Sequence, residues 1–191
     1  MAKVYLALVH YPVYNKRMDV VATAVTNLDV HDIARSSCTY GIAQYFIVHP
    51  VASQQAVVQE ITAYWQDGYG AAYNPDRKTA LALISVQESI EDVIAAIKAS
   101  EGVAPWVVTT DARLYEKTVG YQTLRRQIET DERPVLLLFG TGWGLDKAVM
   151  ERSDAILRPI YGPVEYNHLS VRSAVAIILD RLLGEAWCEQ G

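Results

Sequence analysis

The chain has 191 residues, of which 51% are hydrophobic and 20% are charged, and it carries a formal net charge of −5. This composition excludes extensive disorder, and this length predicts a single domain over residues 1–191. The mild acidity argues against broad, non-specific binding of nucleic acid, which needs a basic surface, but it is compatible with a local basic patch.

Short runs rich in Val, Ile and Leu alternate with stretches of helical period along the chain. This alternation is typical of a parallel sheet covered by crossover helices, so we predict an α/β fold with three layers, α/β/α. A run at Val20–Val25 fits either a strand or the start of a helix. The strands are predicted at Val4–Val9, Tyr45–Val48, Ala80–Ile84, Trp106–Thr109, Val135–Phe139 and Ala155–Leu157.

Apolar residues at helical spacing predict the helices between these strands. One helix is expected after Ser53 as its N-cap, and another is expected to end before Gly102. The final helix, from Ser170 to Gly184, is the clearest because its apolar residues share one side. After the first of these helices, Gly68–Lys78 contains turn residues throughout and predicts a long exposed loop, a kind of segment that often binds ligands.

Cys38 and Cys188 are far apart in the sequence, and the four histidines are dispersed. These residues give no metal-ligand spacing, so we expect no metal site. No apolar run reaches the roughly 18 residues of a membrane span, and the first residues lack the apolar core of a secretory signal. We therefore expect a cytoplasmic protein that does not contact membranes.

The most unusual segment follows the predicted strand Val135–Phe139 and contains three glycines, Gly140, Gly142 and Gly144. Such a loop lets backbone N–H and C=O groups approach a ligand without interference from side chains, which favours a nucleotide. A dinucleotide fold requires G-x-G-x-x-G after its first strand, whereas this chain has G-x-G-x-G near residue 140. A nicotinamide-dependent or other nucleotide-binding enzyme is therefore a weak alternative, and a tight turn without a ligand is another.

Two further segments extend this pattern. Residues 29–42 read DVHDIARSSCTYGI and predict a helix that ends at Gly41, and residues 158–175 read RPIYGPVEYNHLSVRSAV, a Pro/Gly-rich loop that leads into the final helix. Together with FGTGWGL at 139–145, they resemble, in the same order, the three motifs of the SPOUT superfamily of RNA methyltransferases. The three segments span most of the chain.

The resemblance can be followed residue by residue. In the first motif, Arg35 falls on the family's arginine and Asp29 on its asparagine. The second motif matches with one residue deleted, and its Asn and Glu are replaced or lost. In the third motif, His168 falls on the family's asparagine. The remaining matches in the second and third motifs are Phe139, Gly140, Gly142, Gly144, Leu145, Pro159, Ile160, Gly162, Ser170 and Val171.

The resemblance implies a C-terminal trefoil knot, which is a rare exception among protein folds, together with S-adenosyl-L-methionine (SAM) as cofactor and a homodimer whose active site is completed at the interface. The residues fit this reading, because loops around Thr109–Arg113, Gly140–Gly144 and Ile160–Leu169 are expected to meet where α/β sheets bind ligands. The cofactor is expected to contact Thr109, Thr110, Phe139, Gly140, Thr141, Gly142, Trp143, Gly144, Ile160, Tyr161, Gly162, Asn167, His168, Leu169 and Ser170.

The implied function is methyl transfer to tRNA or rRNA, at a ribose 2′-hydroxyl or a base nitrogen. Because the methyl group of a sulfonium is already electrophilic, the protein must orient the acceptor and help to remove its proton. Arg35 is expected to anchor a phosphate or stabilise a developing alkoxide, and His168 to act near the methyl group. Asp29 is expected to orient Arg35 or to serve as a base. The lost Asn and Glu leave open a degenerate module that binds only cofactor or RNA.

Structural roles are the alternatives for several of these residues. Arg35 has Asp32 one helical turn before it as a possible ion-pair partner, and His168 is a possible cap of the last helix. Trp143 fits either stacking on a base or a place in the core or dimer contact. RNA contact is predicted at the loop Gly68–Lys78, because aromatic and basic groups suit unstacked bases and phosphates.

Overall fold

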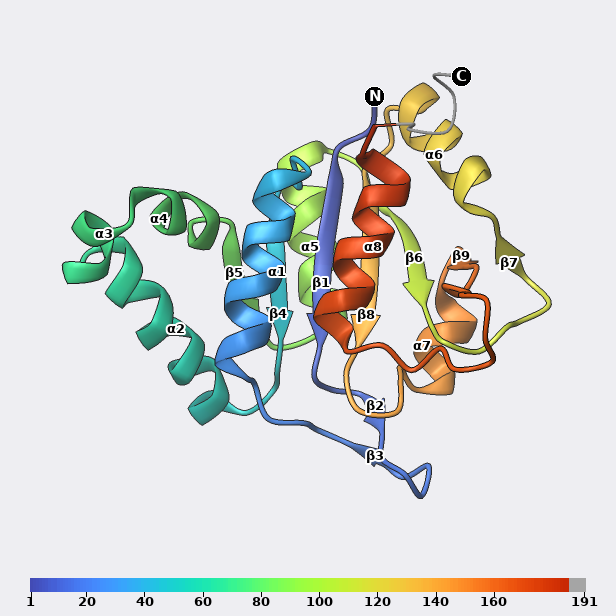
Figure 1. Cartoon of the computed structure of the whole chain (residues 1–191), viewed down its shortest axis with the longest axis horizontal. Helices are drawn as coiled ribbons and strands as arrows, with labels where there is room; N and C mark the ends of the chain where they lie inside the picture. The colour runs from blue at the N-terminus through green and yellow to red at the C-terminus, as the bar shows by residue number, and fades with distance from the viewer. Residues whose placement is uncertain (186–191) are drawn as a thin grey trace.

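A seven-stranded sheet lies at the centre of the computed structural model, which describes residues 1–185, so that Cys188 lies outside the described residues. The strand order is β5-β4-β1-β8-β6-β9-β7, and every neighbouring pair is parallel (Figure 1). The prediction of a parallel α/β fold is therefore confirmed. The strands are β1 (Val4–Val9), β4 (Tyr45–Val48), β5 (Ile84–Gln87), β6 (Trp106–Thr110), β7 (Thr118–Val119), β8 (Val135–Gly140) and β9 (Ala155–Leu157).

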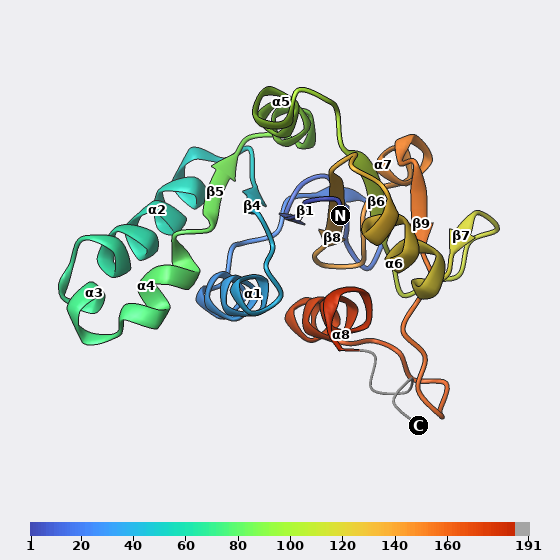
Figure 2. The same ribbon diagram turned by 90° about the horizontal axis from the view of Figure 1, so that it is seen from above.

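Helices cover both faces of this sheet (Figure 2). Because side chains alternate along β1, Leu6 and Leu8 pack with α1 and α8, whereas Ala7 and Val9 pack with α5 and α7. No described helix is long and apolar enough to cross a membrane. The helices are α1 (Asn27–Thr39), α2 (Ala52–Gln66), α3 (Tyr69–Tyr73), α4 (Pro75–Leu81), α5 (Ile90–Glu101), α6 (Tyr121–Thr130), α7 (Lys147–Arg152) and α8 (Val171–Leu183).

The ambiguous run at 20–25 is a strand for two residues only. Val20–Val21 forms β3, which pairs with β2 (Val13–Tyr14) in an antiparallel hairpin outside the main sheet. This hairpin follows the carboxyl end of β1 and covers the loop after β8 (Figure 1).

The prediction of a long exposed loop at Gly68–Lys78 is wrong, because the segment folds into α3 and α4. Its turn residues form the helix ends: the Asn74 side chain accepts a hydrogen bond from the Arg77 N–H, and Pro75 occupies the first turn of α4, where it is well tolerated. The Arg77 guanidinium carbon lies 4.5 Å from the centroid of the Trp65 ring, so this cation packs on α2.

Two predicted element boundaries also differ from those in the structure. The strand expected at Ala80–Ile84 is wrong, because Ala80 and Leu81 are buried residues of α4 and β5 begins only at Ile84. A short apolar run does not distinguish the end of a buried helix from a strand. Ser53 is not a cap, because α2 already begins at Ala52 and its N-cap residue, Val51, makes no side-chain capping bond.

The connections at the centre of the sheet diverge to opposite faces. The chain reaches β8 from the β6 side through α6, whose Leu124 and Ile128 pack in the same core as α8. It leaves β8 through α7, whose Val149 and Met150 pack in the opposite core. Since β6 and β8 are neighbours, the loops at their carboxyl ends separate and leave a crevice, which is where open α/β sheets bind ligands.

Candidate active site

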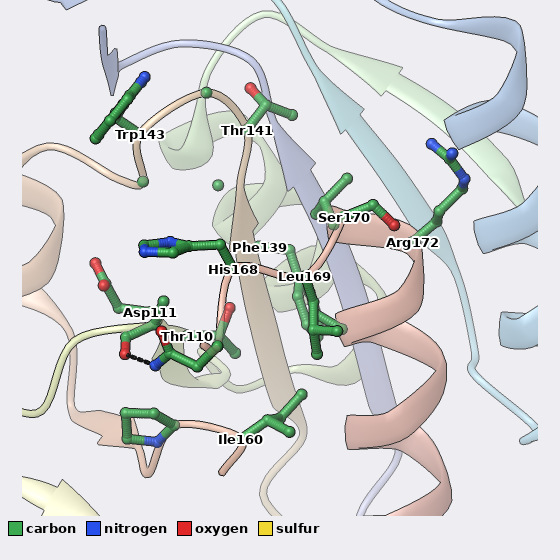
Figure 3. Close-up of a pocket in the computed structure, with 18 of the residues that line it drawn as sticks. Thr110, Asp111, Phe139, Thr141, Trp143, Ile160, His168, Leu169, Ser170 and Arg172 are labelled. Atoms are coloured by element: carbon green, nitrogen blue, oxygen red, sulfur yellow. Dashed lines mark hydrogen bonds between the residues drawn. The ribbon is translucent and has the colours of Figure 1, made fainter. Parts of the chain in front are cut away.

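A cavity of about 740 Å³ lies in this crevice. Thr110 at the end of β6, Gly140 at the end of β8 and Ile160 after β9 all line it (Figure 3). The predicted convergence of three distant loops is therefore confirmed. The cavity is in the size range of small-molecule sites, and Phe139, Ile160 and Leu169 give it apolar walls.

The loop after β8 requires its glycines. Gly144 has a φ of +98°, and a Cβ there would lie 3.1 Å from Oδ2 of Asp111. Gly142 has a φ of +58°, and its Cβ would lie 2.8 Å from the Tyr14 carbonyl oxygen. Two backbone bonds fix this loop on β2: the Trp143 N–H donates to the Tyr14 carbonyl at 2.8 Å, and the Tyr14 N–H donates to Gly144 at 2.9 Å. The glycines thus let this loop pack closely on β2 and on Asp111 at the cavity wall.

A directed chain of hydrogen bonds supports the start of this loop. The Thr141 hydroxyl donates to the Val9 carbonyl at 3.1 Å, so it accepts from the Thr23 hydroxyl. The Thr23 oxygen in turn accepts from Nδ1 of His10 at 3.0 Å. Because the Nδ1 proton is used in this way, Nε2 of His10 carries no proton, and it is buried without a hydrogen-bond partner among residues 1–185.

His49 belongs to the same buried cluster. Its Nδ1 accepts from the Val51 N–H at 3.1 Å, so its Nε2 carries the proton and donates to the Thr23 carbonyl at 3.0 Å. Burial, and then the neighbouring His49, lower the pKa of His10 to about 4, while Asp29 opposes this shift. Burial also lowers the pKa of His49. Both imidazoles are therefore neutral near pH 7, behind a cavity wall formed by Thr23.

Asp111 forms a second part of the wall, with a side chain that is only 4% exposed. Nε and Nη2 of Arg113 donate to its two oxygens at 3.0 and 2.8 Å, and the Tyr115 hydroxyl donates at 3.2 Å. The hydrogen bond from Arg113 to Asp111 raises the pKa of Arg113. Burial, followed by the Asp111 charge, raises the pKa of Tyr115. The carboxylate and the guanidinium neutralise each other in a fixed bidentate geometry.

The expected pairing of Asp29 with Arg35 is wrong within the chain. Asp29 accepts a hydrogen bond from the Thr26 hydroxyl at 2.6 Å and another from Nη1 of Arg172 at 3.3 Å. Nε of Arg172 also lies 3.5 Å from Asp32, so the alternative pairing of Arg35 with Asp32 is not formed either. The structural reason is that the first turn of α1 lies against the first turn of α8, which brings Arg172 within reach.

Most residues predicted to bind the cofactor line this one cavity. Four predicted site residues do not. The Thr109 hydroxyl is buried and donates to the Ala155 carbonyl at 3.3 Å, because Thr109 and Thr110 point to opposite sides of β6. Tyr161 and Gly162 are exposed and lie outside the lining, as does the exposed Arg35 on α1. Those that line the cavity are Asp29, Thr110, Phe139, Gly140, Thr141, Gly142, Trp143, Gly144, Ile160, Asn167, His168, Leu169 and Ser170.

His168 projects into the middle of the cavity (Figure 3). Its ring meets the Tyr166 ring edge to face at 5.7 Å, and it does not cap α8, which begins after Ser170 without a side-chain capping bond. The Asn167 amide donates to the Ala112 carbonyl at 2.6 Å, which ties the loop after β9 to the loop after β6. Trp143 is 54% exposed, so it is not a core residue.

Four functional candidates on the cavity wall were not singled out from the sequence: Thr23, Asp111, Arg158 and Arg172. Asp111 comes two residues after the predicted strand Trp106–Thr109, and this position is a usable signal. Thr23 and Arg172 carry no local signal, since their partners are distant in the sequence.

The family model of SAM-dependent RNA methyltransferases matches residues 3–184. The chain belongs to this family. Over 182 residues it is 49% identical to a tRNA (guanine-N(1)-)-methyltransferase of Oleidesulfovibrio alaskensis, covering 95% of this chain but only 42% of that relative. The chain thus spans less than half of that protein's length. An uncharacterised Aquifex aeolicus protein is 42% identical over 186 residues, covering 97% of this chain and 91% of that protein.

A solved structure places the fold. The A. aeolicus TrmH/SpoU tRNA modifying enzyme superposes with a TM-score of 0.56 at 15% sequence identity, covering 96% of this chain and 75% of that one. The resemblance to the SPOUT superfamily is therefore confirmed, and so is SAM as the family's cofactor.

Proposed function

We propose that this chain transfers the methyl group of SAM to tRNA, at a ribose 2′-hydroxyl or a base nitrogen, and that it acts in the cytoplasm. The observation that carries the proposal is the meeting of three distant loops around one glycine-lined cavity. The tRNA substrate is supported by the name of the Oleidesulfovibrio relative, although this chain corresponds to less than half of that protein.

The residues present fit the cofactor. A Cβ at Gly142 or Gly144 would meet Tyr14 or Asp111, so only glycine lets this loop pack so closely at the cavity wall, where its backbone is left accessible. Backbone N–H and C=O groups suit an adenine edge, and the apolar walls suit its faces. The positive charges of Arg113 and Arg172 are each balanced by carboxylates, so they do not repel a cationic sulfonium.

When bound, the cofactor supplies an electrophilic methyl group, and the chain must orient the acceptor and receive its proton. We assign proton transfer to His168, because its imidazole points into the cavity and is exposed to it. Asp29 is a poor base in this arrangement, since both of its oxygens accept hydrogen bonds from Thr26 and Arg172. Its role is to position Arg172.

A homodimer would give the exposed Arg35 a place in an active site. This side chain is exposed on α1 and does not line its own cavity, so we propose that it reaches the cavity of a second subunit and stabilises charge there. Helices α1 and α8 lie side by side and present a common surface (Figures 1 and 2). Leu28 and Leu169, at the cavity end of that surface, are exposed apolar side chains suited to a subunit contact. The trefoil threading of the C-terminal chain stays a prediction.

The direct test is transfer of a labelled methyl group from SAM to a pool of tRNAs transcribed in vitro. We expect incorporation with the native chain and none with Gly144→Val, whose side chain would press on Asp111 and Arg113 of the cavity wall. Nuclease digestion and mass spectrometry of the product then identify the methylated atom. Calorimetric binding of S-adenosylhomocysteine without any transfer to tRNA or rRNA would instead support a non-catalytic module.

Subunit mixing tests the role of Arg35. Homodimers of Arg35→Ala and of Gly144→Val should both be inactive. In an equal mixture, half of the dimers are mixed, and each of these retains one site with an intact cavity and an Arg35 from the partner. About a quarter of native activity should therefore return, if assembly is random. No recovery from an exchanged mixture would contradict the shared site.

A further inference from the structure

Three arginines line the cavity, and they differ in how their charge is balanced. Arg113 is held by Asp111, and Arg172 lies between two carboxylates of α1. Arg158, which follows β9, forms no ion pair with any residue of the range 1–185, and its side chain is exposed. Within that range, Arg158 is the arginine of the cavity wall whose charge is left for a ligand.

That charge does not suit the cofactor. SAM carries a sulfonium and an ammonium group against a single carboxylate, so its net charge is positive, and an unbalanced guanidinium beside it is repulsive at short range. The acceptor has the opposite charge, because every nucleotide of RNA carries a phosphate. Guanidinium groups bind phosphate in a planar, bidentate geometry that few other side chains match.

We propose that Arg158 binds a backbone phosphate of the RNA, next to the nucleotide that receives the methyl group. The inference rests on the proposed function and deepens it by assigning the substrate side of the cavity. Arg158 is well placed for this role: its N–H donates to the Val119 carbonyl at 2.9 Å, which fixes its backbone. Its guanidinium carbon lies 5.8 Å from the centroid of the Tyr161 ring, which restricts one face of the group and leaves its edge open.

Exposed aromatic rings lie on the neighbouring loops. Trp143 lines the cavity and is 54% exposed, and Tyr166, which contacts His168, is 70% exposed. Rings of this kind stack on unpaired bases, whereas bases in a duplex are not accessible to them. The nucleotide held by Arg158 is therefore expected to be unpaired. Because the net charge of the chain is −5, attraction to RNA has to come from local cations, of which Arg158 is one.

The experiment compares Arg158→Ala and Arg158→Lys with the native chain, and uses Arg126→Ala as the matched control. Arg126 is exposed on α6, is outside this cavity and forms no ion pair within residues 1–185, so its removal changes the net charge equally. Binding of the tRNA pool is measured by filter retention at several salt concentrations. Calorimetry with S-adenosylhomocysteine and circular dichroism report on the cofactor site and the fold.

Loss of the guanidinium should weaken tRNA binding by about 10-fold or more and raise KM for tRNA by a similar factor. The slope of log affinity against log salt should fall by about 0.7 in magnitude, as for one lost phosphate contact to a single strand. Affinity for S-adenosylhomocysteine should stay within about twofold of the native value, and Arg158→Lys should recover part of the tRNA affinity.

Two results would overturn the assignment while leaving the proposed function intact. One is a folded, cofactor-binding Arg158→Ala protein with native tRNA affinity and salt slope. The other is an equal loss in Arg126→Ala, which would show a general charge effect. A native chain that binds S-adenosylhomocysteine but neither binds nor methylates RNA would overturn the proposed function itself, and this assignment with it.

Discussion

The buried imidazole of His10 makes the stability of the fold depend on pH in a specific way. Its Nδ1–H donates to Thr23, and its Nε2 has no hydrogen-bond partner in the described part of the chain. Its pKa is lowered from 6.5 to about 4, first by burial and then by His49. The native state therefore holds His10 neutral at a pH where the unfolded chain protonates it. Acidification should destabilise the fold before most carboxylates titrate.

The sign and the size of this pH dependence follow from the difference in proton binding between the unfolded and the native state. Well above pH 6.5, His10 is neutral in both states and contributes no dependence on pH. As the pH falls from 6.5 towards 4, the unfolded state binds one more proton than the native state, so the free energy of unfolding decreases. At pH 5, the loss relative to pH 8 is about 2 kcal/mol from this group, and it levels off at about 3 kcal/mol below pH 4.

The matched variant is His10→Asn. An asparagine amide places an N–H donor near the position of Nδ1 but does not titrate, so the bond to Thr23 can be kept while the pH dependence is removed. Urea unfolding followed by circular dichroism at pH 8 and pH 5 measures both proteins. The native chain should lose about 2 kcal/mol more than the variant between these values. His49 is present in both proteins, so the difference isolates the part of the pH dependence that requires His10, including its coupling to His49. Equal losses in the two proteins would refute the reasoning.

Three further substitutions test the site and the surface. Gly144 has a φ of +98° and lies beside a buried carboxylate, so Gly144→Val should weaken S-adenosylhomocysteine binding in calorimetry by about 10-fold or more. Gly102 has a φ of +76° but lies in open space. Gly102→Val should therefore cost about 2 kcal/mol of stability without changing this binding. Arg172→Ala should lower the free energy of unfolding in urea by about 1–3 kcal/mol, because it leaves the buried Asp29 without its cation, and Asp29→Asn should restore part of this loss. Tyr69→Ala removes a side chain that is 74% exposed, so stability should be unchanged; if α3 contacts RNA, tRNA affinity in filter binding should fall by about 5-fold or more, and an unchanged affinity would exclude that contact.

The central strands were predictable because each is a short run buried on both sides. In β1 and β8 nearly every residue is buried, which leaves no alternation and produces continuous apolar runs in the sequence. The loop after β8 was predictable for a related reason: a buried strand followed by Gly140, Gly142 and Gly144 has few explanations besides a close approach of backbone. These local signals, with the order of the three motifs, were sufficient to place the cavity.

The segment Gly68–Lys78 shows where local signals mislead. Asn, Pro and Gly are typical of turns, but the same residues begin and end helices, and here Asn74 caps α4. The helices are short, and what holds them is contact with α2 and, for α4, also with α1, including the stacking of Arg77 on Trp65. Short helices of this kind depend on tertiary packing, so their own sequence did not separate them from a loop.

The ion pairs could not be predicted from the sequence for the same physical reason. Asp29 and Arg172 are 143 positions apart, and only the packing of α1 against α8 decides that Asp29 meets Arg172 rather than Arg35. This choice changes the chemistry, because a carboxylate that is fully engaged stops being a candidate base, and an arginine left outside the cavity becomes a candidate for a second subunit. Residue types at motif positions thus predict which groups are available, whereas the fold decides which charges remain unbalanced and can act on a ligand.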